Sequence, residues 1–269
     1  MEIISDKKKL IKALQNYKNI GFVPTMGGIH KGHISLVMKS RQKCSKTVVS
    51  IFINKPQFNK RKDYKNYPRV LNKDISVLKE NKIDYLYLAK EKHIYPPDQS
   101  RNIEINSFEK KLCGKFRPNH FKAVVDVIDR FIKIIKPANI FLGEKDYQQL
   151  ILVEDFVKKN NIKVNIVKCK TIREKNGIAF SSRNILLKKK DYFIAGKIYH
   201  LIKNNKKKLI KRKAFIKIIK KKILSFGANK IEYITVLDIN NLIHGFKRKK
   251  KFRIFIAYYL NSVRLIDNI

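Results

Sequence analysis

The feature that most constrains the fold is an alternation of short apolar runs and helical patterns over the first two thirds of the chain. The runs are rich in β-branched residues, as is typical of buried parallel strands, and cover residues 19–24, 46–54, 84–89, 140–142 and 164–167. Between them lie segments of helical period, the clearest with apolar residues at Val124, Val127, Ile128, Phe131, Ile134 and Ile135. This order predicts an α/β fold with a Rossmann-like, doubly wound parallel sheet.

The last third of the chain has a different pattern. Lys-rich helical segments cover residues 191–224, and two strand-like runs follow at 231–237 and 252–260. We therefore expect two domains: a Rossmann-like domain over residues 1–178 and a smaller C-terminal α+β domain over 179–269.

The charge balance is strongly basic. Lys+Arg 62 against Asp+Glu 21 gives 62 − 21 = +41, which taken alone suggests a nucleic-acid or membrane-surface partner. However, the lysines are spread along the chain together with abundant Ile and Asn, and runs such as 206–208 and 247–251 are typical of solvated faces. We interpret the charge as a compositional trend that favours anionic ligands, without a specific nucleic-acid partner.

Cysteine usage and hydropathy indicate the compartment. The three cysteines, Cys44, Cys113 and Cys169, are odd in number and widely spaced, which argues against a disulfide framework or a zinc site. No apolar stretch approaches the roughly 20 residues that cross a bilayer. We expect a soluble protein of the reducing cytoplasm with no membrane association.

The most informative motif is VPTMGGIHKGH, residues 23–33, which follows a predicted strand and opens a helix. Free N–H groups at a helix N-terminus attract phosphate, and the i, i+3 spacing puts His30 and His33 on one side. Its glycine spacing imitates a P-loop, but His33 and Ile34 stand where Lys and Ser or Thr would be, so it is not a Walker A motif. The alternative is a simple strand–turn–helix corner with two surface histidines.

Two further segments suit phosphate binding. Residues 180–184 read FSSRN and combine serines with a basic residue, although a serine-rich linker would look similar. Residues 141–149 read FLGEKDYQQ, again strand into helix, where Lys145 supplies a positive charge and Asp146 and Gln149 can face one ligand.

Amide side chains follow two of the predicted strands. Asn54 and Gln57 come after one buried strand, and Gln149 after another. Helix capping and turn formation would explain them, but amides at two strand ends also suit a neutral polar substrate with hydroxyl groups. Because ligands of open α/β sheets bind at the carboxyl ends of strands, we expect all these motifs to meet.

Together the motifs resemble the pantothenate synthetase family, and the HxGH pattern alone resembles adenylate-forming nucleotidyl transferases. The matches run in the family's order from about residue 20 to the end of the sequence: PTMGGIHKGH, Asn54 with Gln57-Phe58, Tyr67-Pro68-Arg69, Arg117-Pro118-x-His120-Phe121, GEKDYQQL, SSRN and Arg264-Leu265-Ile266-Asp267. Departures are the Lys55-Pro56 order, Ala123 and Phe180, which affect loop shape and adenine packing rather than the reaction class.

The resemblance implies an ATP-dependent ligase that condenses pantoate with β-alanine through an adenylate, with Mg²⁺ accompanying ATP and a homodimer as the assembly. It implies that residues 1–178 bind ATP and pantoate and that 179–269 close over the nucleotide. The implied catalytic residues are His33, His30, Lys145 and Arg183. The implied ATP contacts are Met26, Gly27, Gly28, Ile29, His30, Lys31, Gly32, His33, Gly143, Glu144, Lys145, Asp146, Ile172, Phe180, Ser181, Ser182 and Arg183.

The implied contacts to pantoate and β-alanine are Gln57, Gln149, Asn54 and Tyr67. Asp74 is a candidate neighbour of magnesium, with helix capping as the alternative. Two other functions stay open at this point. One is a different HxGH-type nucleotidyl transferase, and the other is a basic nucleic-acid-binding protein with an enzyme-like fold.

Overall fold

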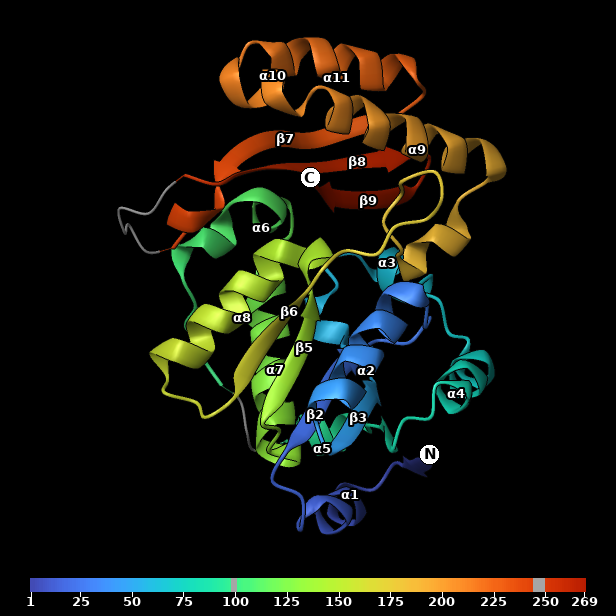
Figure 1. The fold of residues 1–269 in the computed structure, drawn as a ribbon, viewed down its shortest axis with the longest axis vertical. Coiled ribbons are helices and arrows are strands. Elements are labelled where there is room, and N and C mark those ends of the chain that lie inside the picture. Colours follow the sequence, from blue (N-terminus) through green and yellow to red (C-terminus); the bar gives the residue numbers. More distant parts are fainter. Residues whose placement is uncertain (98–100, 244–249) are drawn as a thin grey trace.

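The computed structural model describes residues 1–97, 101–243 and 250–269. The first domain contains a six-stranded sheet in the order β1-β4-β3-β2-β5-β6, in which every pair of neighbouring strands is parallel. The strands are β1 (Glu2–Ile4), β2 (Ile20–Thr25), β3 (Lys46–Ile51), β4 (Tyr85–Leu88), β5 (Asn139–Gly143) and β6 (Asn165–Cys169). The predicted Rossmann-like parallel sheet is confirmed (Figure 1).

Helices cover both faces of this sheet, as a doubly wound fold requires. The longer ones are α1 (Lys7–Leu14), α2 (Lys31–Lys43), α4 (Leu71–Glu80), α7 (His120–Ile135) and α8 (Tyr147–Lys159). The short ones are η1 (Lys55–Gln57), α3 (Arg61–Lys65), α5 (Glu91–Ile94), η2 (Ser107–Lys110), α6 (Leu112–Phe116) and η3 (Glu144–Asp146).

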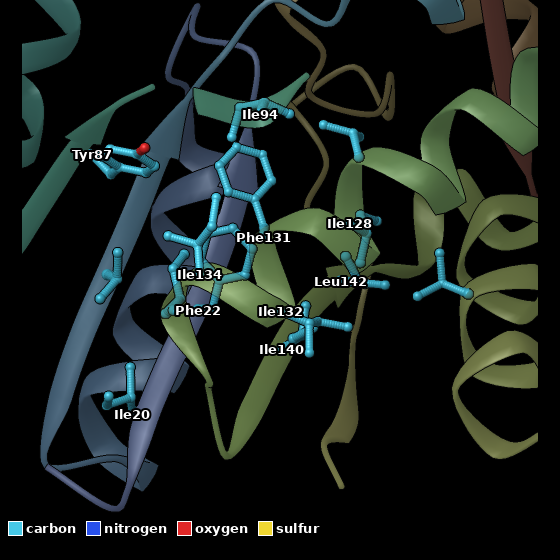
Figure 2. Close-up of a cluster of buried hydrophobic side chains, with 14 of the residues drawn as sticks. Ile20, Phe22, Tyr87, Ile94, Ile128, Phe131, Ile132, Ile134, Ile140 and Leu142 are labelled. Carbon is cyan, nitrogen blue, oxygen red and sulfur yellow. The ribbon is translucent and has the colours of Figure 1, made fainter. Parts of the chain in front are cut away.

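Both faces of the parallel sheet are apolar, and successive side chains of each strand pack on opposite faces. Phe22 and Ile140 pack with α1, α7 and α8 in one buried cluster, whereas the adjacent Val23 and Phe141 pack with α2 and α4 in another. Figure 2 shows the first cluster, in which Phe131 of α7 lies against the sheet. Successive strand residues point to opposite faces, so continuous apolar runs are needed here.

The second domain is an antiparallel sheet covered by helices. Its strands are β7 (Lys230–Asp238), β8 (Phe252–Leu260) and β9 (Val263–Asn268), paired in that order. Its helices are η4 (Ser182–Leu186), α9 (Lys189–Asn204), α10 (Lys206–Lys211), α11 (Phe215–Ser225) and η5 (Ile239–Asn241). It forms its own buried cluster and lies at one end of the first domain, at the top of Figure 1. The predicted smaller α+β domain is confirmed.

The predicted division after residue 178 lies between strand β6 and helix η4. Strand β6 ends at Cys169, and Ile178 already packs in the core of the second domain. The elements that were not predicted from the sequence include β1, α1 and β9. Part of the basic run over 247–251, residues 247–249, lies outside the described residues. Within the described residues, no helix is long and apolar enough to span a bilayer.

The strand order places a crevice beside β2. This strand pairs with β3 on one side and with β5 on the other, so the chain winds in opposite directions from it. Such a switch point leaves a gap between the loops at the carboxyl ends of the strands, where ligands of open α/β sheets bind.

Candidate active site

A cleft opens at this switch point. Sequence-predicted residues from both domains line it: Met26, His30, Gly32, His33, Asn54, Gln57, Tyr67, Gly143, Lys145, Asp146, Gln149, Ile172, Phe180, Ser181, Ser182 and Arg183. The other predicted residues, Gly27, Gly28, Ile29, Lys31, Glu144 and Asp74, are not among the described residues that line it.

The two histidines form a stacked pair at the start of α2. His30 is the N-cap, where its Nδ1 accepts a hydrogen bond from the His33 backbone N–H at 3.3 Å. The ring centroids are 3.9 Å apart with an interplanar angle of 14°. Burial, with a contribution from the Lys145 charge, lowers the pKa of His30 to about 4. Burial also lowers the pKa of His33 well below its usual value, with His30 and Lys145 adding to the effect.

Both imidazoles are therefore neutral near pH 7, and each can donate one ring N–H to a ligand. Because His30 Nδ1 accepts a bond, its free proton is on Nε2. The Nδ1 atom of His33 is buried and has no hydrogen-bond partner within the described part of the chain. A buried polar atom without a partner is costly unless a ligand or water satisfies it, which is typical of a functional site.

The glycine turn before these histidines is held by Asp74. Gly27 and Gly28 have φ of 81° and 63°, a conformation that favours glycine. The Asp74 carboxylate is 2% exposed and accepts hydrogen bonds from Gly28 N at 2.8 Å and Ile29 N at 2.7 Å. The helix-capping alternative for Asp74 is wrong: the N-cap of α4 is Val70, and Asp74 reaches from inside the helix to another loop.

The SSRN segment closes on that turn from the second domain. Ser182 Oγ lies 3.2 Å from Gly27 O and 3.0 Å from Gly28 O, and can donate to either carbonyl. The Arg183 guanidinium forms an ion pair with Asp63 at 3.0 Å. The predicted phosphate-binding segments 23–33 and 180–184 are thus in direct contact, although 154 residues separate Gly28 from Ser182.

The turn after β5 contributes Lys145 and Asp146 to the cleft. Lys145 Nζ is 3.4 Å from Asp146 Oδ1. The neighbouring Glu144 has a different use, because its carboxylate pairs with Arg253 of β8 at 3.1 Å. Glu144 therefore joins the domains, whereas its sequence neighbours face the ligand space.

Asn54 holds Gln57 in place. Asn54 is 1% exposed, and its Nδ2 donates to Gln57 Oε1 at 3.0 Å and to Ala123 O at 3.2 Å. Tyr95 O–H donates to Asn54 Oδ1 at 2.8 Å. Gln57 Nε2 lies on the cleft side, 3.2 Å from Met26 Sδ. Both amides line the cleft, and Asn54 orients the side chain of Gln57.

Arg117 and His120 belong to one of the sequence motifs, which gave them no predicted role, and both line the cleft. Arg117 donates to His120 Nε2 at 3.1 Å and to Gln57 O at 3.1 Å. Since arginine only donates, His120 Nε2 accepts, and Nδ1–H donates to Gln57 O at 2.7 Å.

Burial and the nearby arginines decide the charge of this pair. Burial and Arg117 lower the pKa of His120 well below its usual value, so its ring is neutral. Burial, Arg183 and Arg264 lower the pKa of Arg117 to about 10. Arg117 nevertheless stays charged near pH 7, so it adds a cation beside Gln57 that attracts anionic substrates.

Magnesium has few carboxylate ligands available in the cleft. Of the described residues that line it, Asp146 alone carries a carboxylate. Both oxygens of Asp74 accept backbone hydrogen bonds, which leaves Asp74 poorly suited to a metal. Within the described ranges there is no group of three or more His, Cys, Asp or Glu side chains that could hold a metal ion.

Comparison with known proteins agrees with this geometry. The family described as Pantoate-beta-alanine ligase matches the chain over residues 1–269. The chain belongs to the pantoate–β-alanine ligase family. The pantothenate synthetase of Francisella tularensis subsp. novicida is 40% identical over 271 residues, which are 99% of this chain and 96% of that protein. The pantothenate synthetase of Thermosipho africanus is 37% identical over 272 residues, 100% of this chain and 98% of that protein.

Solved structures of the same family have this fold. The pantoate–β-alanine ligase of Francisella tularensis, complexed with beta-gamma ATP and β-alanine, has a TM-score of 0.85 at 37% identity, covering 100% of this chain and 97% of that one. The pantothenate synthetase of Thermus thermophilus has a TM-score of 0.91 at 28% identity, covering 100% and 99%. The resemblance deduced from the motifs is thus confirmed over the whole length.

Proposed function

We propose that this chain condenses pantoate with β-alanine to form pantothenate, with cleavage of ATP to AMP and diphosphate. The observation that carries the proposal is one cleft in which the two phosphate loops and Lys145 meet the substrate-facing Gln57 and Gln149. Membership of the pantoate–β-alanine ligase family over residues 1–269, and a relative whose title names beta-gamma ATP and β-alanine, support the choice of substrates.

The reaction has two steps. An oxygen of the pantoate carboxylate attacks the α-phosphorus of ATP, a P–O bond forms, and diphosphate leaves. The β-alanine amine then attacks the acyl carbon of the adenylate, an amide C–N bond forms, AMP leaves, and the amine loses a proton. Phosphoryl transfer of this kind needs mainly positioning and stabilisation of developing negative charge.

The proposed roles follow from position and charge. His30 and His33 donate ring N–H bonds to the phosphates, and the backbone N–H groups of the glycine turn lie beside them. Lys145 and Arg183 supply positive charge from opposite domains. Gln57 and Gln149 hold pantoate, with Asn54 orienting Gln57, and Tyr67 lines the same space. His33 is also a candidate to accept the amine proton, since its ring is neutral.

Residues 1–178 then bind ATP and pantoate, and 179–269 close over the nucleotide. We propose that Mg²⁺ arrives with ATP, where phosphate oxygens and water are its usual ligands and Asp146 is the carboxylate that fits beside it. The ion would neutralise part of the negative charge of the phosphates. A homodimer and a cytoplasmic location complete the proposal, and the three free cysteines support a reducing compartment.

The test is an assay of pantothenate with each substrate omitted in turn. The expected result is equal amounts of pantothenate, AMP and diphosphate only when all three substrates are present. Pantoate-dependent exchange of labelled diphosphate into ATP without β-alanine is expected from the adenylate. Exchange driven by a phosphorylated substrate and not by pantoate would contradict the proposal and indicate a different nucleotidyl transferase. Light scattering would test the homodimer.

A further inference from the structure

A side chain of the second domain is hydrogen-bonded to the main chain of the turn that carries Lys145. Asn268 of β9 donates through Nδ2 to Glu144 O and to Lys145 O, both at 2.8 Å. It is 5% exposed, so these bonds are shielded from water. Two consecutive carbonyl groups of the turn are thereby held by one amide.

Arg253 of β8 completes this contact. Its Nη1 donates to Asn268 Oδ1 at 2.8 Å, and its Nη2 pairs with Glu144 Oε2 at 3.1 Å. Its guanidinium also lies over the Tyr147 ring, 4.3 Å from the centroid. Both amide protons and the oxygen of Asn268 are therefore used, which gives the side chain one orientation.

Strand β9 is itself anchored beside this amide. Arg173 forms a bidentate pair with Asp267, with distances of 2.6 and 2.9 Å, and donates to Asn268 O at 3.1 Å. The turn is thus held by an anchored strand, and Lys145 of the same turn lines the cleft.

We infer that Asn268 is a positioning residue for adenylate formation, which acts by setting the main-chain position of Lys145. This rests on the proposed function. Asn268 does not line the cleft, so its effect on the reaction passes through the turn. The same contact makes the position of Lys145 depend on docking of the second domain.

The first variant is Asn268→Asp, which keeps the shape of the side chain and removes both donated bonds. A displacement near 1 Å at a catalytic group costs roughly 100-fold in rate, so we expect kcat for pantoate-dependent ATP–diphosphate exchange to fall roughly 10- to 100-fold. The KM for pantoate should stay near the wild-type value, because Gln57 in η1 and Gln149 in α8 lie outside the turn that Asn268 holds.

A double-mutant cycle separates positioning from general destabilisation. In a Lys145→Met background, Asn268→Asp should cause little further loss, because the group that it positions is absent. An equal fold-loss in both backgrounds would overturn the inference. The control is Asn205→Asp, which removes an amide bond to a backbone carbonyl, Leu201 O at 2.9 Å, elsewhere in the same domain and should leave exchange unchanged.

If Asn268→Asp does not fold, Arg253→Gln provides the same test, because it loosens Asn268 and Glu144 without removing the amide. Its loss of kcat should also vanish in the Lys145→Met background, and persistence there would overturn the inference. An inactive wild-type enzyme would contradict the proposed function instead. An active wild type with an indifferent Asn268→Asp variant would contradict only the positioning role.

Discussion

The imidazole of His33 stacks on that of His30 at 3.9 Å, and both rings are neutral. Two protonated rings at this distance would repel each other, and the nearby Lys145 charge adds to the penalty. The two rings therefore add neutral hydrogen-bond donors to a cleft whose positive charge comes from side chains such as Lys145, Arg183 and Arg117.

Replacement of His33 tests the importance of one such donor. We expect His33→Ala to fold normally and to lose roughly 100- to 1,000-fold in kcat, equivalent to about 2.7–4 kcal/mol, because a preorganised donor to developing charge is removed. Pantoate-dependent diphosphate release measures this. His200→Ala on the exposed face of α9 is the control, and turnover like that of the wild type in His33→Ala would remove His33 from the mechanism.

Acid should destabilise the protein through His30. Its pKa falls from 6.5 to about 4 on folding, so the unfolded chain binds the extra proton between these values. Above pH 6.5 the ring is neutral in both states, and His30 does not reduce the free energy of unfolding. As the pH falls from 6.5 toward 4, the free energy of unfolding should decrease by about 3 kcal/mol, at roughly 1.4 kcal/mol per pKa unit. Urea unfolding at several pH values measures this loss.

The matched variant for this experiment is His30→Asn, which keeps a good N-cap acceptor for α2 and removes the titrating group. Its free energy of unfolding should depend less steeply on pH than that of the wild type between pH 6.5 and 4. Parallel curves for the two proteins would show that His30 does not carry this dependence.

Asp74 is expected to shape the nucleotide loop and not to bind magnesium. Asp74 accepts hydrogen bonds from the backbone N–H groups of Gly28 and Ile29. In Asp74→Asn, one of these N–H groups faces the N–H of the new amide, which should lower the free energy of unfolding by about 1–3 kcal/mol. We expect a higher KM for ATP and an unchanged half-saturating Mg²⁺ concentration. Glu80→Gln, on the exposed end of the same helix, is the control. A tenfold shift in the Mg²⁺ requirement of Asp74→Asn would instead favour the metal role.

Much of the fold and the chemistry could be predicted because both depend on local patterns. The longer strands of the parallel sheet have continuous apolar runs, and the motifs follow β2, β3 and β5 directly. The rule that parallel strands present their carboxyl ends at one edge then brings the motifs together. The short strand β1 and the polar strand β9 were not predicted, because a few residues of mixed polarity show no clear period.

The contacts that tie the site together could not be predicted, because they join distant residues. Asp74 reaches a backbone N–H 45 residues away, Arg183 pairs with Asp63 over 120 residues, and Glu144 pairs with Arg253 over 109. No local pattern distinguishes such a carboxylate from one that caps a helix or faces solvent. Only the packing of the elements decides which use each one has.

The adjacent Gln148 and Gln149 should respond to mutation in opposite ways. Gln148 accepts from Cys113 N at 3.1 Å and donates to Phe108 O at 2.9 Å and Lys111 O at 2.7 Å, all away from the cleft. Gln149 lines the cleft. One helical position thus separates an amide that holds backbone groups from one that lines the cleft.

We expect Gln148→Ala to lower the free energy of unfolding by about 1–3 kcal/mol, because buried backbone groups lose their partners, with a nearly unchanged KM for pantoate. Gln149→Ala should raise that KM several-fold and leave unfolding within about 0.5 kcal/mol of the wild type. Urea unfolding and initial rates on both variants measure the two effects, and each variant is the control for the other. If Gln148→Ala raised the KM while Gln149→Ala did not, the assignment of the two amides would be reversed.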